Sequence, residues 1–162
     1  NKYIGRFTFS ISQTNKEEWG FIIVENAAGE FYAKACTTSH SDQYVKLDRT
    51  LASGEKIIAE LHTHPDAANN PLDRSVPSGS DFNTLKINSR DRYTSFIDCG
   101  NIRYAIVVEN VNSSRSFFNN PQNRIDLLDY NTNNNAQTKF NWVTNWQMPQ
   151  KRQLKKLLEI VQ

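Results

Sequence analysis

Residues 56–64, KIIAELHTH, constrain the fold of this chain more than any other segment. In an extended strand alternate residues point to opposite faces, and one face of this segment is apolar, with Ile57, Ala59 and Leu61. The opposite face carries Ile58, Glu60, His62 and His64. Pro65 follows and ends the strand, because proline has no N–H to donate to a neighbouring strand. We therefore expect a strand that packs one face on a core and presents two histidines side by side at its end.

Two hairpins are predicted around this strand. Residues 21–24 and 31–36 flank the sequence ENAAGE, in which Gly29 tolerates the positive φ of a tight turn. Residues 93–110 predict a second hairpin. Its return strand is nearly all apolar, so it should be buried at the centre of a sheet.

Two further strands are predicted outside the hairpins. Residues 6–12, RFTFSIS, alternate and place Phe7 and Phe9 on one face. Residues 124–130, RIDLLDY, predict a strand at a sheet edge.

Two segments predict helices. In residues 78–89 Ser78 is a plausible N-cap and Asp81 follows three residues later, ahead of an apolar spacing. Residues 150–162 predict an amphipathic helix packed on the sheet, because apolar residues recur at i, i+3, i+4 and i+7: Leu154, Leu157, Leu158 and Val161. Polar or proline-rich stretches predict loops at 40–55, 65–77, 110–123 and 131–139. The expected fold class is α+β: one domain over residues 1–162, with a single mixed sheet flanked by a few helices.

Composition and charge exclude several classes of protein. The 19 basic and 17 acidic residues nearly balance, and no basic stripe with interleaved aromatic residues indicates a nucleic-acid partner. No apolar run approaches the ~20 residues of a membrane span, and residues 1–13 lack the apolar region of a signal peptide. Cys36 and Cys99 belong to no CxxC or CxxH spacing, which argues against a cysteine-based zinc site. Whether these two cysteines form a disulfide stays open.

His62 and His64 are candidate metal ligands, because they project from the same face of a rigid strand. Two histidines, one carboxylate and a water molecule make a catalytic zinc site. We choose Asp81 as the carboxylate, since it follows a loop that can fold back onto the strand. Asp66 and Asp73 lie on that loop, and Glu60 shares the face as a supporting group. Asp81 also allows a purely structural interpretation, in which its negative charge complements the positive N-terminus of a helix.

The same residues resemble a known motif. "HTHP" followed by "PSGSD" fits H-[ST]-H-P and then S-x-x-D, and the glutamates of "EEWGFII" precede an apolar strand. This pattern resembles the JAMM motif of the JAB/MPN metalloprotease superfamily. It is most similar to bacterial JAB-like domains of the kind found in secreted polymorphic and Rhs-type toxins. The resemblance covers about residues 17–110 and does not account for residues 111–162, where we expect a strand, a polar loop and a helix.

The resemblance implies a JAB/MPN-like, cytidine deaminase-like architecture with one Zn²⁺ bound by His62, His64 and Asp81. It makes Glu18 the general acid and base, with Glu17 as the other permitted choice, and Ser78 the group that stabilises the oxyanion. The gap from His64 to Asp81 is longer than in deubiquitinating members. Residues 66–76 look like an insertion beside the site, which weakens the expectation of a ubiquitin-like substrate.

The implied function is zinc-dependent hydrolysis of amide bonds, peptide or isopeptide, in a protein or peptide substrate. The implied context is the effector or toxin module of a larger bacterial protein that is secreted or delivered into a target cell, with a cognate immunity protein as a further partner. Two alternatives remain open: a catalytically inactive JAB-like binding module, and a metal-independent toxin hydrolase or nuclease that uses His62, His64 and Glu60.

Overall fold

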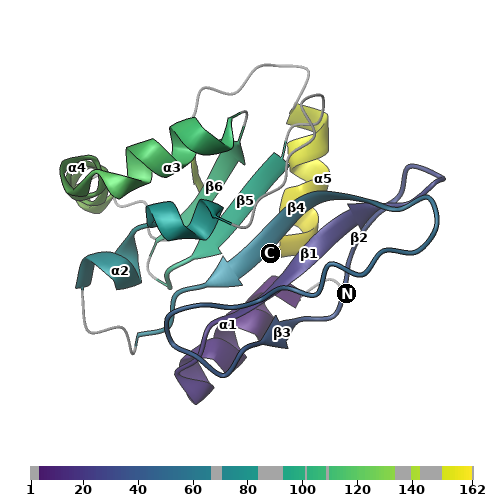
Figure 1. Ribbon diagram of the computed structural model, residues 1–162, viewed down its shortest axis with the longest axis horizontal. Coiled ribbons are helices and arrows are strands. Elements are labelled where there is room, and N and C mark those ends of the chain that lie inside the picture. The colour runs from purple at the N-terminus through teal and green to yellow at the C-terminus, as the bar shows by residue number, and fades with distance from the viewer. Residues whose placement is uncertain are drawn as a thin grey trace.

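A mixed β-sheet forms the centre of the protein (Figure 1). The computed structural model describes residues 4–66, 71–83, 93–100, 102–108, 110–133, 140–142 and 151–161. Within them the sheet has seven strands: β1 (Trp19–Glu25), β2 (Phe31–Ala33), β3 (Thr37–Thr38), β4 (Lys56–Thr63), β5 (Tyr93–Asp98), β6 (Arg103–Val108) and β7 (Phe140–Trp142). Their order is β2-β1-β4-β5-β6-β7, and β3 also pairs with β1. The β4–β5 and β6–β7 pairs are parallel and the others are antiparallel.

Helices cover both faces of this sheet. Helices α1 (Ile4–Asn15) and α5 (Lys151–Val161) pack on one face. The opposite face is covered by α3 (Val111–Asn119), α4 (Pro121–Asn133) and the 3₁₀ turn η1 (Gly79–Phe82), with the short helix α2 (Pro71–Ser75) beside them. The expected α+β class with a mixed sheet is thereby confirmed. Among the described residues, no helix has the length and apolarity needed to cross a membrane.

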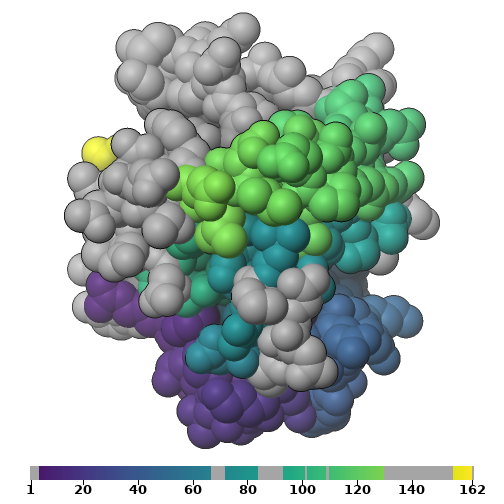
Figure 2. Space-filling model, turned by 90° about the vertical axis from the view of Figure 1, so that its left-hand side faces the viewer, coloured from purple at the N-terminus to yellow at the C-terminus, as the bar shows by residue number. Residues whose placement is uncertain are grey.

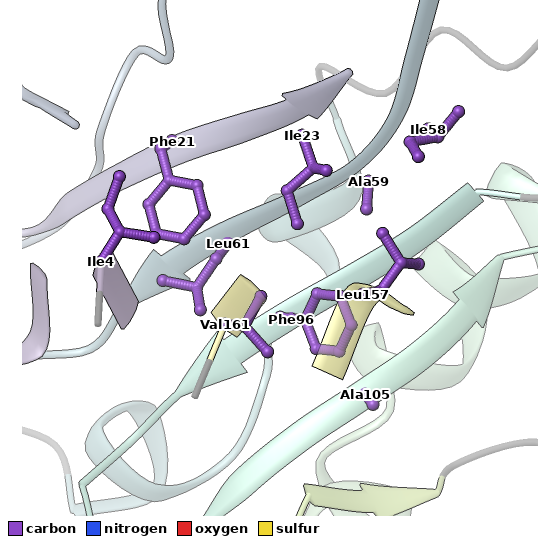
Figure 3. Close-up of a cluster of buried hydrophobic side chains, with 10 residues drawn as sticks. All are labelled: Ile4, Phe21, Ile23, Ile58, Ala59, Leu61, Phe96, Ala105, Leu157 and Val161. Carbon is purple, nitrogen blue, oxygen red and sulfur yellow. The ribbon is translucent and has the colours of Figure 1, made fainter. Parts of the chain in front are cut away.

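The first hydrophobic core lies between the sheet and helices α1 and α5 (Figure 3). Its buried side chains come from both helices and four strands: Ile4, Phe21, Ile23, Ile58, Ala59, Leu61, Phe96, Ala105, Leu157 and Val161. The amphipathic helix predicted at the C-terminal end is confirmed, because Leu157 and Val161 are buried in this core and Leu158 packs against it.

The two predicted hairpins are confirmed. Strands β1 and β2 pair in register from Glu25 opposite Phe31, and Gly29 in the turn has a φ of 77°. Strands β5 and β6 form the second hairpin, and β6 is buried between β5 and β7. The loop predicted at 40–55 contains no helix or strand.

The predicted alternation of β4 is correct only from Ala59 onward. A β-bulge lies where Ile23 pairs with Ala59 and the next residue, Val24, pairs with Ile57. The extra residue reverses the alternation. Ile58 therefore joins the core with Ala59, whereas Ile57 packs on the opposite face.

The strand predicted for residues 6–12 is wrong, because this segment lies in helix α1. Its buried positions follow a helical spacing, from Ile4 and Gly5 to Thr8 and Ser12. Phe7, which the strand prediction placed on one face with Phe9, is 57% exposed. Packing on α5 selects the helix, and the alternation of the two phenylalanines is incidental.

The loop predicted at 110–123 and the edge strand predicted at 124–130 are also wrong, because α3 and α4 occupy these residues. The side chain of Asn110 caps α3 by accepting a hydrogen bond from the Ser113 amide at 3.0 Å. Pro121 starts α4, at the helical position where proline is favoured.

The other differences between prediction and structure are smaller. Helix α2 lies within the loop predicted at 65–77, residues 131–133 complete α4, and residues 84–89 and 134–139 fall outside the described part of the chain.

Candidate metal centre

His62 and His64 lie at the end of β4, where two other elements fix the backbone. The His64 amide donates to Asp98 O at 2.9 Å, which extends the pairing with β5. Thr63, between the histidines, points to the other face and donates to Ser12 Oγ of α1 at 2.7 Å. Both imidazoles are therefore held on the face opposite α1, and both are buried.

Gly20 of β1 lies opposite His62 and permits a close approach of the two strands. A Cβ atom at this position would lie 2.5 Å from Leu61 O, 2.6 Å from a methyl group of Leu47 and 3.1 Å from His62 Cβ. Any larger residue would therefore displace the strand that carries the histidines or the loop that packs over it.

Asp81 of η1 faces both histidines. Its Oδ1 lies 3.6 Å from His62 Nε2, and its Oδ2 lies 3.5 Å from His64 Nε2. These distances exceed the 2.7–3.2 Å of an N–H···O hydrogen bond. They match the edge of a coordination tetrahedron, since zinc–ligand bonds of about 2.0–2.2 Å separate two ligand atoms by about 3.3–3.6 Å. These two distances are compatible with ligands around one ion.

The hydrogen bonding of His62 also fits a cation. His62 Nε2, which faces Asp81, is buried and has no hydrogen-bond partner. Such orphaned atoms are uncommon in protein interiors and call for an explanation. One ligand atom from each of His62, His64 and Asp81 lies within 4.8 Å of the others. Two imidazoles and a carboxylate suit a divalent transition metal, so these three residues could hold one metal ion.

Asp81 is held in place by the residue that starts its own turn. The Ser78 amide donates to Asp81 Oδ2 at 2.7 Å, and the Ser78 hydroxyl lies 2.5 Å from the Ser80 hydroxyl. Burial raises the pKa of Asp81, but the two imidazoles outweigh it and hold the pKa well below its usual range. The carboxyl is therefore ionised, as a metal ligand must be.

The pKa values of the two imidazoles shift upward, opposite to the shift of Asp81. Burial lowers the pKa of His62, but Asp81 outweighs it and the pKa is raised. Burial also lowers the pKa of His64, but the neighbouring Cys99 and Asp81 outweigh it and raise this pKa well above its usual value. A proton and a metal ion would therefore compete for the imidazole nitrogen atoms of this site.

The two adjacent glutamates have different environments. Glu18 is buried, and burial raises its pKa while the charges of His62 and His64 partly offset that rise. Glu17 lies nearer the surface, where it contacts His40 Nδ1 at 3.2 Å. Glu18 is thus the glutamate that interacts with the histidine pair.

The other carboxylates near the pair in sequence have partners elsewhere. Asp66 is exposed and pairs with Arg74, and Asp73 pairs with an arginine of α4. Glu60, expected as a supporting group, instead accepts hydrogen bonds from Arg49 at 2.5 Å and from the Tyr93 hydroxyl at 2.7 Å. These two partners are distant from Glu60 in sequence, so no local pattern could have identified them.

Cys99 is the residue near the site that the sequence did not single out. Burial raises the pKa of its thiol, and the nearby His64 partly offsets that rise. It follows β5 directly, and its closeness to His64 depends on the parallel pairing of β4 with β5. Cys36 and Cys99 are both free thiols.

Comparison with known proteins finds no matching family model, curated protein or solved structure. The assignment of a function to this site therefore depends on the geometry and chemistry of its own residues.

Proposed function

We propose that this protein is a zinc-dependent hydrolase of peptide or isopeptide bonds, with His62, His64 and Asp81 as metal ligands. The observation that carries the proposal is the ligand-like spacing of the three side chains, together with the orphaned Nε2 atom of His62. A buried glutamate beside them, Glu18, supplies the group that amide hydrolysis requires in addition to the metal.

Each residue of the site has a chemical task in this proposal. When bound, zinc lowers the pKa of a water molecule from about 15.7 toward about 7 and polarises a carbonyl group. Glu18 accepts the proton of the attacking water and later passes it to the leaving amine. Its raised pKa brings its carboxyl closer to the proton affinity that both transfers need. The Ser78 hydroxyl donates to the oxygen that gains charge.

The metal-independent alternative requires Glu60 to act with the histidines. Its ion pair with Arg49 and its hydrogen bond from Tyr93 occupy Glu60 in a separate buried network. The zinc site with Glu18 therefore accounts for the arrangement better. The binding-module alternative loses support because each residue that the motif requires is present.

The biological context in the proposal is an effector or toxin module of a larger bacterial protein, acting on a protein or peptide of a target cell and restrained by an immunity protein. It is supported by the similarity of the HTHP and PSGSD segments to bacterial JAB-like domains. Co-purification with the product of a gene adjacent to its own tests the immunity partner.

A chelation experiment separates the three functions. The zinc-loaded protein is incubated with a library of peptides containing ordinary and lysine-linked amide bonds, and products are identified by mass spectrometry. We expect cleavage that a chelator abolishes and added zinc restores, and no cleavage by His62→Ala. Cleavage that persists after chelation favours the metal-independent hydrolase, and a zinc-loaded protein that cleaves nothing favours the binding module.

A further inference from the structure

Arg124 of helix α4 is bound to the segment that carries Asp81. Its Nε donates to Pro77 O at 2.8 Å, and its Nη2 donates to Asp73 Oδ1 at 2.6 Å and to Val76 O at 3.3 Å. The Arg124 side chain is only 11% exposed. Figure 2 shows the green surface of α3 and α4 directly against the teal surface that includes α2 and η1.

One of these contacts is on the peptide group that positions the metal ligand. The carbonyl of Pro77 and the amide of Ser78 belong to the same planar peptide unit. The carbonyl accepts from Arg124, and the amide donates to Asp81 Oδ2 at 2.7 Å. An oriented and polarised carbonyl makes the N–H across the peptide bond a better donor.

We propose that Arg124 is a positioning residue for the metal centre, acting on Asp81 through the Pro77–Ser78 peptide group. The proposal rests on the proposed function, since it assigns to Asp81 the role of a metal ligand. A carboxylate ligand binds well only when its orientation is set in advance, and loss of such a supporting contact typically weakens metal affinity about 10- to 100-fold.

Two neighbouring contacts show that this segment is fixed along its length. The Tyr104 hydroxyl of β6 donates to Ser75 O at 2.7 Å. A Cβ atom added to Gly79 would lie 1.9 Å from Asn119 Oδ1 and 2.9 Å from Arg115 O, so α3 packs directly against the turn. Arg124 differs from both because its contact is with the peptide group whose amide binds Asp81. Residues 111–133, which the motif resemblance does not cover, thereby become part of the site.

The test compares Arg124→Met with Asp73→Ala in the full chain. Both variants remove the Arg124–Asp73 ion pair, but only Arg124→Met removes the hydrogen bond to Pro77 O. The first measurement is the affinity for Co²⁺, followed through its visible absorption. We expect Arg124→Met to weaken Co²⁺ binding about 10- to 100-fold and to alter the spectrum. Asp73→Ala should stay within about threefold of the parent, because the peptide group keeps its partner.

The second measurement needs no metal. In the metal-free protein, the Ser78 amide proton should resonate downfield and exchange slowly, because it is bonded to a carboxylate. Arg124→Met should weaken both features and Asp73→Ala should keep them. A parent protein that binds no Co²⁺ would overturn the proposed metal function, and the Ser78 amide would then decide the Arg124 proposal alone.

Two results would overturn the positioning role. One is an Arg124→Met protein with the parent's Ser78 amide and Co²⁺ affinity. The other is an Asp73→Ala protein that reproduces both losses, which would assign the effect to the ion pair. Should Arg124→Met fail to fold, Arg124→Lys is judged by the same measurements, because lysine keeps the charge and lacks the planar set of donors.

Discussion

At the scale of single residues, burial and nearby charges give two adjacent glutamates different environments. Glu17 and Glu18 are adjacent in sequence, yet Glu17 contacts His40 near the surface and Glu18 is buried by the histidine pair. Burial raises the pKa of the Glu18 carboxyl, which suits a group that must both accept and release a proton near neutral pH. Burial thus distinguishes two adjacent residues of the same type.

Replacing Glu18 should separate metal binding from turnover. We expect Glu18→Gln to keep one zinc ion per chain and to lower the rate of hydrolysis about 10²- to 10⁴-fold, because the general acid–base is removed while the ligands stay. Glu17→Gln is the matched control and should keep most of its activity. Rates and zinc content measured on the same preparations decide the assignment. Full activity of Glu18→Gln with a loss in Glu17→Gln would transfer the role to Glu17.

The three proposed ligands were predictable from the sequence, whereas their surroundings were not. His62 and His64 are two residues apart at the end of a strand, and Asp81 lies in a short turn farther along the chain. The contacts of Arg49 with Glu60, of Cys99 with His64 and of Arg124 with Pro77 join residues from different elements. No spacing within one element encodes them, because they depend on the strand order and on how the helices pack.

At the scale of elements, helix α1 shows how tertiary packing decides secondary structure. The alternation of Phe7 and Phe9 favours a strand locally, but the helix buries Gly5, Thr8 and Ser12 on one side. A Cβ atom on Gly5 would lie 1.7 Å from Val161 O, so α1 meets the end of α5 backbone to backbone. These contacts join opposite ends of the chain and are invisible to local patterns.

This packing predicts the effect of Gly5→Ala. Alanine favours a helix over glycine by about 1 kcal/mol, but the overlap with α5 costs about 1–3 kcal/mol. We therefore expect a net loss of stability in urea denaturation. Ser10→Ala, at an exposed position of the same helix, should change the free energy of unfolding by less than about 0.5 kcal/mol. A Gly5→Ala protein more stable than the parent would show that the two helices do not meet in this way.

The other elements fall into those whose local sequence pattern was strong enough to predict them and those whose pattern was too weak. The β1–β2 and β5–β6 hairpins and helix α5 were correctly predicted, because apolar periodicity and turn residues agree there. Helices α3 and α4 were missed, since their asparagine- and serine-rich sequence resembles loop composition. The Asn110 cap and Pro121 at a first helical position were the available indications.

At the scale of the whole molecule, the two faces of the sheet have different tasks. The face under α1 and α5 is a closed apolar core. The opposite face holds the candidate metal centre at one end of β4 and a second apolar cluster under η1, α3 and α4. Helix α1 holds the end of β4 on the first face, through the hydrogen bond from Thr63 to Ser12. On the second face, η1 brings Asp81 to the histidines.

The stability of the metal-free protein and the additional stabilisation by zinc should respond to pH in opposite directions, because protons and zinc bind the same folded site. The raised pKa values of His62 and His64 contribute to the stability of the metal-free protein. This contribution is fully present below the unfolded histidine pKa of about 6.5, and it is lost as pH rises through the pKa values of the folded protein. Between about pH 6 and pH 8, urea midpoints of the metal-free protein should therefore fall. With excess zinc the stabilisation by metal should grow over the same range, because binding displaces protons.

Two variants check that the histidine pair is the source of this response. His64→Gln should flatten the dependence in the metal-free protein. His40→Gln, which removes the surface histidine beside Glu17, should leave it unchanged. A metal-free protein whose midpoint rises over this range, or a His40→Gln variant that abolishes the dependence, would contradict the linkage.

The most direct test of the central claim is the zinc content of the purified protein after equilibration with buffered zinc, measured by mass spectrometry with variants in parallel. We predict one zinc ion per chain in the parent and in Asp66→Ala, whose exposed carboxylate lies on the neighbouring loop. His62→Ala and Asp81→Ala should retain less than about a tenth of that amount, because each removes one of three protein ligands. A parent protein without zinc, or an Asp81→Ala protein that binds it as the parent does, would contradict the account.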